Sequence, residues 1–399
     1  MQLRTIHPFP ARMAPELALN ALHSLPANSV VLDPMAGSGT VLRQAVELGH
    51  RAIGFDLDPL AVLMSKVWTT PIDDEVVGRI ASSAIEEARK VDLRSSKLPW
   101  VQNDKETANF IDYWFAAPQR RDLQRLSFVL HQRAQTKLAP KERAALDVMR
   151  IALSRIIVTK EQVASLARDT SHSRPHKVAE TSSVNVFDVY SRSLEQLRKR
   201  LRDEPPMRGA TVNHGDARKL SLADSSVDAV MTSPPYLNAI DYLRGHRMSL
   251  VWLGHRLPDL RQIRATSIGA ERAGDPLAGE DVARATKKVA AAMLGGGQLP
   301  ANYVSMVQRY AYDLVCMASE IKRVLKPGAR ATFVVGNSCL KGTFIKNSRG
   351  VATASALAGL RKDSEFEREL PASNRYLPTP SEGALGKRMR TEAVLTFSN

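Results

Sequence analysis

The segment 232–236, with the sequence TSPPY, contains the residue types that point most directly to chemistry. It follows the apolar run 227–231, so it is expected to form a loop at the end of a strand. Ser233 offers a hydroxyl acceptor, and Tyr236 offers a flat ring on which a planar base can stack. The two prolines lack an N–H and leave nearby carbonyls free to accept from an exocyclic amine. The segment is a candidate catalytic loop, although a plain turn can have the same sequence; its candidate residues are Ser233, Pro234, Pro235 and Tyr236.

A glycine-rich loop, PMAGSGT at 34–40, lies much earlier, between a strand-like run at 29–33 and a helix-like run at 41–48. Gly37 and Gly39 permit a positive φ, and the helix start offers free N–H groups to an anionic group such as a carboxylate. The loop has no lysine, which argues against the phosphate-binding motif G-x-x-x-x-G-K-[ST]. It also lacks the third glycine of the dinucleotide fingerprint, so a smaller adenosine cofactor fits better.

Two acidic residues follow the next expected strand, at 49–55. The carboxylate of Asp56, directly after this strand, could accept hydrogen bonds from both hydroxyls of a ribose. Asp58 precedes Pro59 and a helix-like run, a pattern typical of a helix cap. We therefore assign the ribose to Asp56.

Together these motifs resemble the amino-group DNA methyltransferases that use S-adenosylmethionine, and the serine of S-P-P-Y resembles the cytosine-N4 branch most. The resemblance implies that the glycine loop holds the methionine part of the cofactor and Asp56 its ribose. It further implies that the segment 6–17 closes over the cofactor and that the segment 213–218 places an acid near the adenine amine; without the family, these segments are an extended turn and a surface turn. The cofactor residues implied are Phe9, Pro10, Asp33, Pro34, Gly37, Gly39, Thr40, Asp56 and Asp216.

Strand and helix patterns alternate through most of the chain, which predicts a doubly wound, mostly parallel α/β sheet. The resemblance implies that this sheet is of the Rossmann-like class I methyltransferase type. In the C-terminal half we expect a helix that ends at 320–325, a turn at 326–328, a strand at 331–336 and a final edge strand at 390–397. Residues 1–71 and 206–399 form the predicted catalytic domain.

Residues 72–205 interrupt this alternation with helical stretches at 139–159 and 186–202, which predicts an inserted helical module that contributes to DNA recognition. A second stretch, 254–300, combines arginines with the glycines 295–297 and shows no sheet pattern. It is expected to be a variable basic loop region within the catalytic domain.

The chain has 56 Lys and Arg against 41 Asp and Glu, a formal charge of +15, which indicates a polyanionic partner such as double-stranded DNA. Residues 1–71 have five bases and five acids, whereas residues 72–210 have 25 bases and 19 acids. Phosphate contacts are therefore expected outside the cofactor region, although a run of charge is often only a solvated face. The candidate contacts are Arg198, Lys199, Arg200, Arg244, Arg256 and Arg264.

Two cysteines, Cys316 and Cys339, can form neither a disulfide framework nor a four-ligand zinc site, and no metal is expected. Neither lies in the Pro-Cys pair that the cytosine-C5 family uses, so a covalent C5 route is not expected. The chain shows no signal peptide core and no run long enough to cross a bilayer, which favours a cytoplasmic protein without membrane contact.

The sequence thus predicts a site-specific DNA methyltransferase acting on the N4 amine of a flipped cytosine, with a restriction or phage-defence partner implied by the resemblance. Three alternatives stay open. The same fold could act on adenine N6 in DNA, or on a base of structured RNA. From a different class, the chain could be an inactive nucleic-acid-binding module that retains the fold.

Overall fold

The computed structural model describes residues 4–9, 13–159, 163–168, 175–237, 242–269, 279–369 and 391–399. The chain divides into two compact units. We call them the helical unit (Met1–Pro10, Asp58–Gly209 and Asp241–Ile263) and the sheet unit (Ala11–Leu57, Ala210–Ile240 and Arg264–Asn399).

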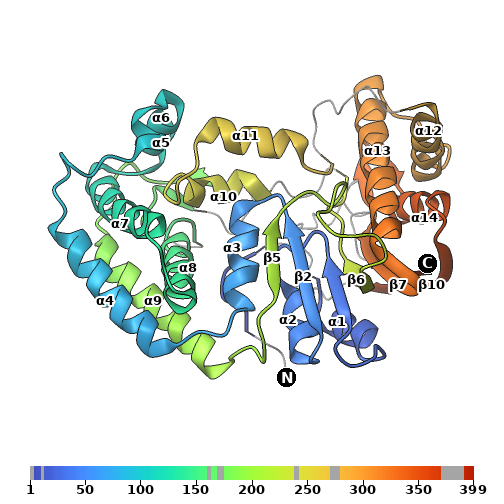
Figure 1. Cartoon of the computed structure of the whole chain (residues 1–399). Coiled ribbons are helices and arrows are strands. Elements are labelled where there is room, and N and C mark those ends of the chain that lie inside the picture. The colour runs from blue at the N-terminus through green and yellow to red at the C-terminus, as the bar shows by residue number, and fades with distance from the viewer. Residues whose placement is uncertain are drawn as a thin grey trace. The chain divides into compact units, whose positions relative to one another are not determined.

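The sheet unit contains a seven-stranded sheet in the order β10-β11-β7-β6-β1-β2-β5, of which Figure 1 shows β5 and β2 side by side. Its strands are β1 (Val30–Asp33), β2 (Arg51–Asp56), β5 (Thr211–His214), β6 (Val227–Thr232), β7 (Leu325–Gly336), β10 (Arg361–Glu369) and β11 (Thr391–Ser398). Its helices are α1 (Pro15–Leu22), α2 (Thr40–Glu47), α12 (Glu280–Leu294), α13 (Ala301–Val324) and α14 (Asn347–Leu357), and it also holds the short pair β8 (Ser338–Leu340) and β9 (Thr343–Ile345).

Strands β5, β2, β1, β6 and β7 are parallel, and only β11 runs antiparallel to its neighbours β7 and β10. The predicted Rossmann-like α/β sheet is therefore confirmed. The prediction of β11 as an edge strand was wrong, because the exposed strand β10 pairs with it and forms the edge instead. Four consecutive buried residues in β11 agree with its interior place.

Alternate residues of the central strands divide between two hydrophobic clusters, one on each face of the sheet. Val31 of β1 and Val334 of β7 pack with buried residues of α1 and α2. Leu32 and Phe333, their neighbours in sequence, pack with α12, α13 and α14. Helices thus cover both faces, and the polar ends of the strands are the part of the sheet left for ligands.

The predicted turn at 326–328 lies within β7 in the structure. The pairing of β6 with β7 shifts register here, since Val227 pairs with Leu325 while Ala229 pairs with Arg330. Gly328 adopts a φ of 76°, which glycine tolerates without strain, and its N–H donates to the carbonyl of Asn399 at 2.9 Å. The turn sequence therefore forms a bulge in the strand and does not separate it from α13.

The helical unit contains α3 (Pro59–Trp68), α4 (Asp74–Lys90), α5 (Pro99–Gln102), α6 (Lys105–Trp114), α7 (Ala117–Gln135), α8 (Pro140–Ser154), α9 (Val186–Asp203), α10 (Tyr242–Leu250) and the short pair β3 (Ala167–Arg168) and β4 (His176–Lys177). Helix α8 begins with a proline at its first position, and the Glu142 side chain accepts from the N–H of Ala139 at 3.0 Å. Nine of its residues are buried, so it lies at the centre of this unit. The helices predicted at 139–159 and 186–202 are confirmed as α8 and α9.

The compact helical unit extends beyond the predicted module 72–205, since it includes α3 and α10. The predicted loop region 254–300 is largely helical where the structure describes it, because α11 (Leu257–Thr266) and α12 lie within it. Leu257 and Leu260 of α11 are buried, and so are Val289 and Met293 of α12, so an apolar face organises each helix. The prediction missed this spacing because the arginines and glycines dominate the composition of the stretch.

Candidate active site

The glycine loop leaves the end of β1 and leads directly into α2. Gly37 has a φ of 52° and Gly39, at the N-cap of α2, a φ of 88°, which are conformations that residues with a side chain rarely adopt. Gly39 provides no side chain to cap the helix, so the first turn of α2 can offer its N–H groups to an anion.

The end of β2 fixes the position of this loop. The N–H of Ala36 donates to the carbonyl of Phe55 at 2.8 Å, and the N–H of Gly37 donates to Oδ2 of Asp56 at 2.8 Å. Asp56 therefore contacts the glycine loop as well as standing at the predicted ribose position. Asp58 caps α3, as predicted, by accepting from the N–H of Leu60 at 2.9 Å.

Asp33, the last residue of β1, is almost fully buried at 3 % exposure. Its Oδ1 accepts from the Thr232 hydroxyl at 2.8 Å and from the N–H of Met35 at 3.1 Å. Burial raises the pKa of the Asp33 carboxyl to about 7. The two hydrogen bonds lower this pKa by a smaller amount, and the negative charge of Asp56 adds to the rise. Thr232 is the last residue of β6, so this hydrogen bond joins the starts of the glycine loop and the catalytic loop.

The candidate catalytic loop, residues 232–236, follows β6, and contacts within the chain hold its polar groups in place. The Ser233 hydroxyl donates to the carbonyl of Val334 at 2.9 Å. Burial raises the pKa of Tyr236 to about 12 and the charge of Glu392 adds to this, while a hydrogen bond with Ser233 opposes the rise. The phenol of Tyr236 is therefore protonated at neutral pH.

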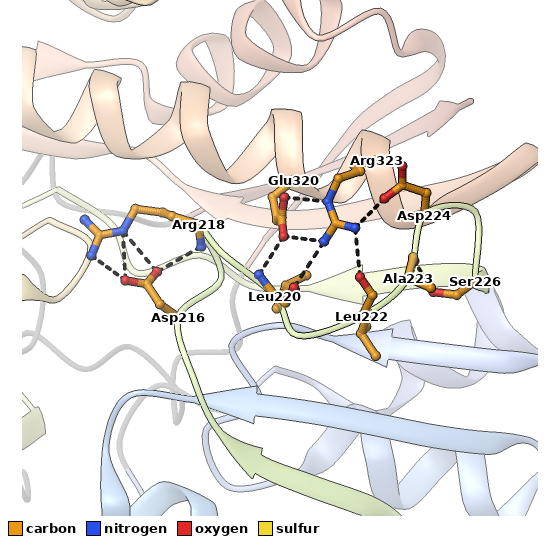
Figure 2. A network of polar contacts seen from close by, with 9 residues as sticks. All are labelled: Asp216, Arg218, Leu220, Leu222, Ala223, Asp224, Ser226, Glu320 and Arg323. Carbon is orange, nitrogen blue, oxygen red and sulfur yellow. Dashed lines mark hydrogen bonds and ion pairs between the residues drawn. The ribbon is translucent and has the colours of Figure 1, made fainter. Parts of the chain in front are cut away.

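Asp216 follows β5 and is held by a nearby arginine (Figure 2). Both oxygens of its carboxylate accept hydrogen bonds from the guanidinium of Arg218, and the shortest, from Nη2, is 2.6 Å. Arg218 also contacts Asp313 of α13 at 2.5 Å. Neither spacing nor composition identifies Asp313 as a partner, because it lies on a helix far along the chain.

Phe9 belongs to the helical unit, where it stacks on Tyr242 with ring centroids 5.0 Å apart and lies 5.6 Å from the ring of His246. His246 contacts the carboxylate of Asp58 at 2.5 Å. The sequence analysis did not assign a role to Tyr242 or His246; their i, i+4 spacing on α10 is the signal that places them on one helix face. Pro10 lies outside the described residues.

Two of the three basic residues proposed on α9 contact the chain itself. Arg198 donates to the carboxylate of Asp74 at 2.8 and 3.0 Å, and Arg200 donates to the carbonyl of Thr5 at 2.7 Å. Lys199 is exposed. The described contacts thus give the two arginines a role in joining α9 to α4 and to the N-terminal segment.

We expect the single variants on α9 to separate these roles. Lys199→Ala should reduce the log–log salt slope of duplex binding by at most about 0.9, the value of one phosphate contact. Arg198→Ala should instead lower the free energy of unfolding by about 1–3 kcal/mol, since the carboxylate of Asp74 loses two hydrogen bonds. Titration at several salt concentrations and thermal unfolding measure the two effects. A larger slope change in Arg198→Ala than in Lys199→Ala would contradict this division.

The remaining proposed phosphate contacts lie on or beside α10 and α11. Arg256 is exposed and forms an ion pair with Asp259 at 2.8 Å. Arg264 is exposed on α11, and Arg244 is half-buried on α10. An exposed pair such as Arg256 with Asp259 contributes little to stability and can exchange for a phosphate at small cost.

Among the described residues, no group of three or more His, Cys, Asp or Glu side chains is arranged to hold a metal ion. Within the same residues, no helix has the length and apolar character needed to cross a membrane.

No protein-family model matches the sequence. The chain is similar to the Type II methyltransferase M.MvaI of Kocuria varians, with 22% identity over 98% of this chain and 90% of the relative. It is also similar to the Type II methyltransferase M.MjaII of Methanocaldococcus jannaschii, with 25% identity over 30% of this chain and 23% of the relative.

Solved structures with a similar course of the chain include a SAM-dependent methyltransferase from Methanosarcina mazei, with a TM-score of 0.32, 10% identity and coverage of 94% of this chain and 95% of that chain. Another is the geranyl diphosphate C-methyltransferase of Streptomyces coelicolor, with a TM-score of 0.36, 8% identity and coverage of 96% of this chain and 77% of that chain. The similarity in sequence to these two Type II methyltransferases and the Rossmann-like sheet together support a methyltransferase function.

Proposed function

We propose that this chain is a DNA methyltransferase that transfers a methyl group from S-adenosylmethionine to the exocyclic N4 amine of a flipped cytosine. One observation carries the proposal. The glycine loop and the catalytic loop leave the carboxyl ends of β1 and β6, which are adjacent parallel strands, and the hydrogen bond from Thr232 to Asp33 joins them. Open parallel sheets bind their ligands at this end, so a cofactor on one loop and an amine on the other would meet.

The residues of the glycine loop fit such a cofactor. Gly37 and Gly39 allow the backbone to approach it closely, and the start of α2 suits a carboxylate. When bound, S-adenosylmethionine supplies an electrophilic methyl group on a sulfonium. Asp33 and Asp56 provide carboxylates for its cationic and hydroxyl groups, while Asp216 is the proposed acceptor for the adenine amine.

The catalytic loop fits the amine. The Ser233 hydroxyl gives its own hydrogen to Val334, so its oxygen keeps one lone pair, besides the one in contact with Tyr236, that can accept from an N–H of the base. The Pro234 carbonyl is the second acceptor. Two acceptors at two N–H bonds turn the conjugated lone pair of the amine out of the ring plane, which is the geometry that attack on a methyl group requires.

Tyr236 is the proposed stacking surface for the base. Its phenol stays protonated and bonded to Ser233, so the ring and the serine are held as one unit. Extruding a base costs a few kcal/mol, which stacking and backbone contacts offset. Exposed Lys199, Arg256 and Arg264 are the proposed phosphate contacts. A restriction or phage-defence partner is also proposed, because the relatives are Type II methyltransferases.

Nucleoside analysis tests the proposal. The protein is incubated with methyl-labelled cofactor and either duplex DNA or structured RNA, and the digested nucleosides are then separated. Label in N4-methylcytosine from DNA is the expected result. Label in N6-methyladenine or in an RNA nucleoside would overturn the assigned base or polymer, and the absence of any transfer would favour an inactive binding module.

Asp56→Ala tests the cofactor assignment. The substitution removes the acceptor for two ribose hydroxyls and for the N–H of Gly37, so the affinity for S-adenosylmethionine is expected to fall by roughly 1.5–3 kcal/mol. Calorimetry on the folded variant measures the change. Glu47→Ala on α2 is the control, since Glu47 forms an ion pair with Arg43 of the same helix and is not among the proposed cofactor residues. An unchanged affinity in Asp56→Ala would remove Asp56 from the site.

A further inference from the structure

Arg218 connects the acid after β5 to two other parts of the sheet unit. Its Nε and Nη2 donate to Asp216, at 3.0 and 2.6 Å from the nearest oxygens. Its Nη1 donates to Asp313 of α13 at 2.5 Å, and Nη2 also donates to the carbonyl of Thr266 at 2.6 Å. Asp313 in turn accepts from the N–H of Gly269 at 3.1 Å. All three nitrogens of the guanidinium are therefore engaged.

These contacts leave the carboxylate of Asp216 with a defined remaining capacity. A carboxylate oxygen can accept about two hydrogen bonds. Oδ1 already accepts from the backbone N–H of Arg218 at 2.9 Å and from Nε at 3.0 Å. Oδ2 has one short contact, to Nη2 at 2.6 Å, and shares Nε at 3.2 Å. The single hydrogen on Nε is shared by the two oxygens, so three hydrogens of Arg218 occupy a carboxylate that has about four acceptor positions. Within the described contacts, one acceptor position of Asp216 is thus open, and Arg218 fixes the orientation of the carboxylate.

The electrostatics support the same arrangement. Burial by itself lowers the pKa of Arg218, but the hydrogen bonds that Arg218 donates to Asp216 and the charge of Asp313 outweigh this, so its pKa is held above its ordinary value. The guanidinium is a permanent cation between two carboxylates, which would otherwise repel each other. Its planar shape suits the two-point contact with Asp216, a geometry that a lysine cannot reproduce.

We propose that Arg218 is a positioning residue that holds Asp216 with one open acceptor for the adenine amine and so sets the preference of this site for a 6-amino over a 6-oxo purine. This inference rests on the proposed cofactor. An amino group can donate to the open acceptor position of Asp216. A 6-oxo group is itself an acceptor, so neither its oxygen nor the open position of the carboxylate would receive a hydrogen bond. With Asp216 free to rotate, the distinction would weaken.

The same unit contains a matched arginine for a control (Figure 2). Arg323 holds Glu320 through Nε and Nη2 at 2.9 and 2.6 Å, and contacts Asp224 through Nη1 at 2.6 Å. It also donates to the carbonyls of Leu220 and Leu222. Both arginines therefore bridge two acids and donate to backbone carbonyls, but the acids of Arg323 are not among the proposed cofactor residues.

The experiment compares Arg218→Lys with Arg323→Lys, which keep the positive charge and lose the two-point contact. Calorimetry measures the affinity of each protein for S-adenosylhomocysteine and for S-inosylhomocysteine. The parent protein is expected to prefer the adenosyl compound on the order of 100-fold. We expect Arg218→Lys to reduce the preference to about tenfold or less, mainly through weaker binding of the adenosyl compound, and Arg323→Lys to retain it.

A general loss of stability would lower both affinities together and leave their ratio unchanged, so the ratio distinguishes positioning from a structural role. If Arg218→Lys does not fold, Arg218→Gln, which also loses the two-point contact with Asp216, provides the same comparison. If the folded Arg218 variant kept the preference of the parent protein for the adenosyl compound, the inference about Arg218 would be overturned, while the proposed cofactor would stand. Failure of the parent protein to bind S-adenosylhomocysteine would overturn the proposed cofactor as well.

Discussion

Ser233→Ala is expected to lower the rate of methyl transfer about 100-fold, a loss comparable to that of one preorganised hydrogen-bonding group in an active site. Its hydroxyl donates to Val334 and keeps one lone pair for the target amine beside its contact with Tyr236, and alanine has no acceptor at this position. The affinity for S-adenosylmethionine should stay within about twofold of the parent value, because the effect is confined to the reacting amine. Single-turnover transfer to DNA, with cofactor binding measured separately, gives both numbers.

Ser226→Ala is the matched control. Ser226 precedes β6, and its hydroxyl donates to the carbonyl of Ala223 at 2.6 Å. Two variants separate the roles of the Tyr236 ring and its hydroxyl. Tyr236→Phe keeps the ring that stacks on the base and loses the bond to Ser233, whereas Tyr236→Ala loses both. Full activity in Ser233→Ala, or equal losses in Ser226→Ala and Ser233→Ala, would contradict the assignment of Ser233.

The second large effect concerns the pH dependence of Asp33. Burial raises the pKa of its carboxyl to about 7 in the folded protein, whereas an Asp in an unfolded chain titrates near about 4. Between these values the folded state retains a proton that the unfolded state releases. The contribution of Asp33 to the free energy of unfolding therefore falls as the pH rises from about 4 to about 7 and is constant above this range.

Asp33→Asn is expected to remove this dependence. The asparagine oxygen can still accept from Thr232 and Met35, so the variant should unfold at a higher temperature than the parent at pH 8 and with a smaller difference at pH 5. Thermal unfolding at the two pH values measures the change. A variant less stable than the parent at pH 8 would show that the ionised carboxylate is stabilising and that its pKa is not raised.

The same carboxylate links the proposed cofactor to pH. S-adenosylmethionine is cationic, so its binding favours the ionised form of Asp33 and releases a proton below pH 7. The affinity should rise with pH, by up to about tenfold per unit between pH 5 and 7, and level off above. Calorimetry in buffers of different ionisation enthalpy measures the number of protons released when the cofactor binds. Asp33→Asn should bind more weakly at pH 8 and release none.

The sequence by itself determined the local structures that form the candidate site. The order of strand, glycine loop and helix around Gly37 and Gly39 follows from an apolar run, residues that tolerate a positive φ and a helical pattern, and all three lie within a short segment. The cap at Asp58 and the strand before Ser233 are equally local. Neighbouring residues decide such features, so a linear pattern is sufficient to predict them.

Only the tertiary structure decided which of these pieces meet and which charges are satisfied within the chain. The pairing of β1 with β6 brings Asp33 to Thr232 from 199 positions away, and Arg198 meets Asp74 from 124 positions away. The sequence pattern describes the face and the period of a segment but not its partner, because the partner depends on how whole elements pack. For the same reason β11 reads as an edge strand until β10 is seen beside it, and Arg218 reads as a surface charge until Asp313 is seen beside it.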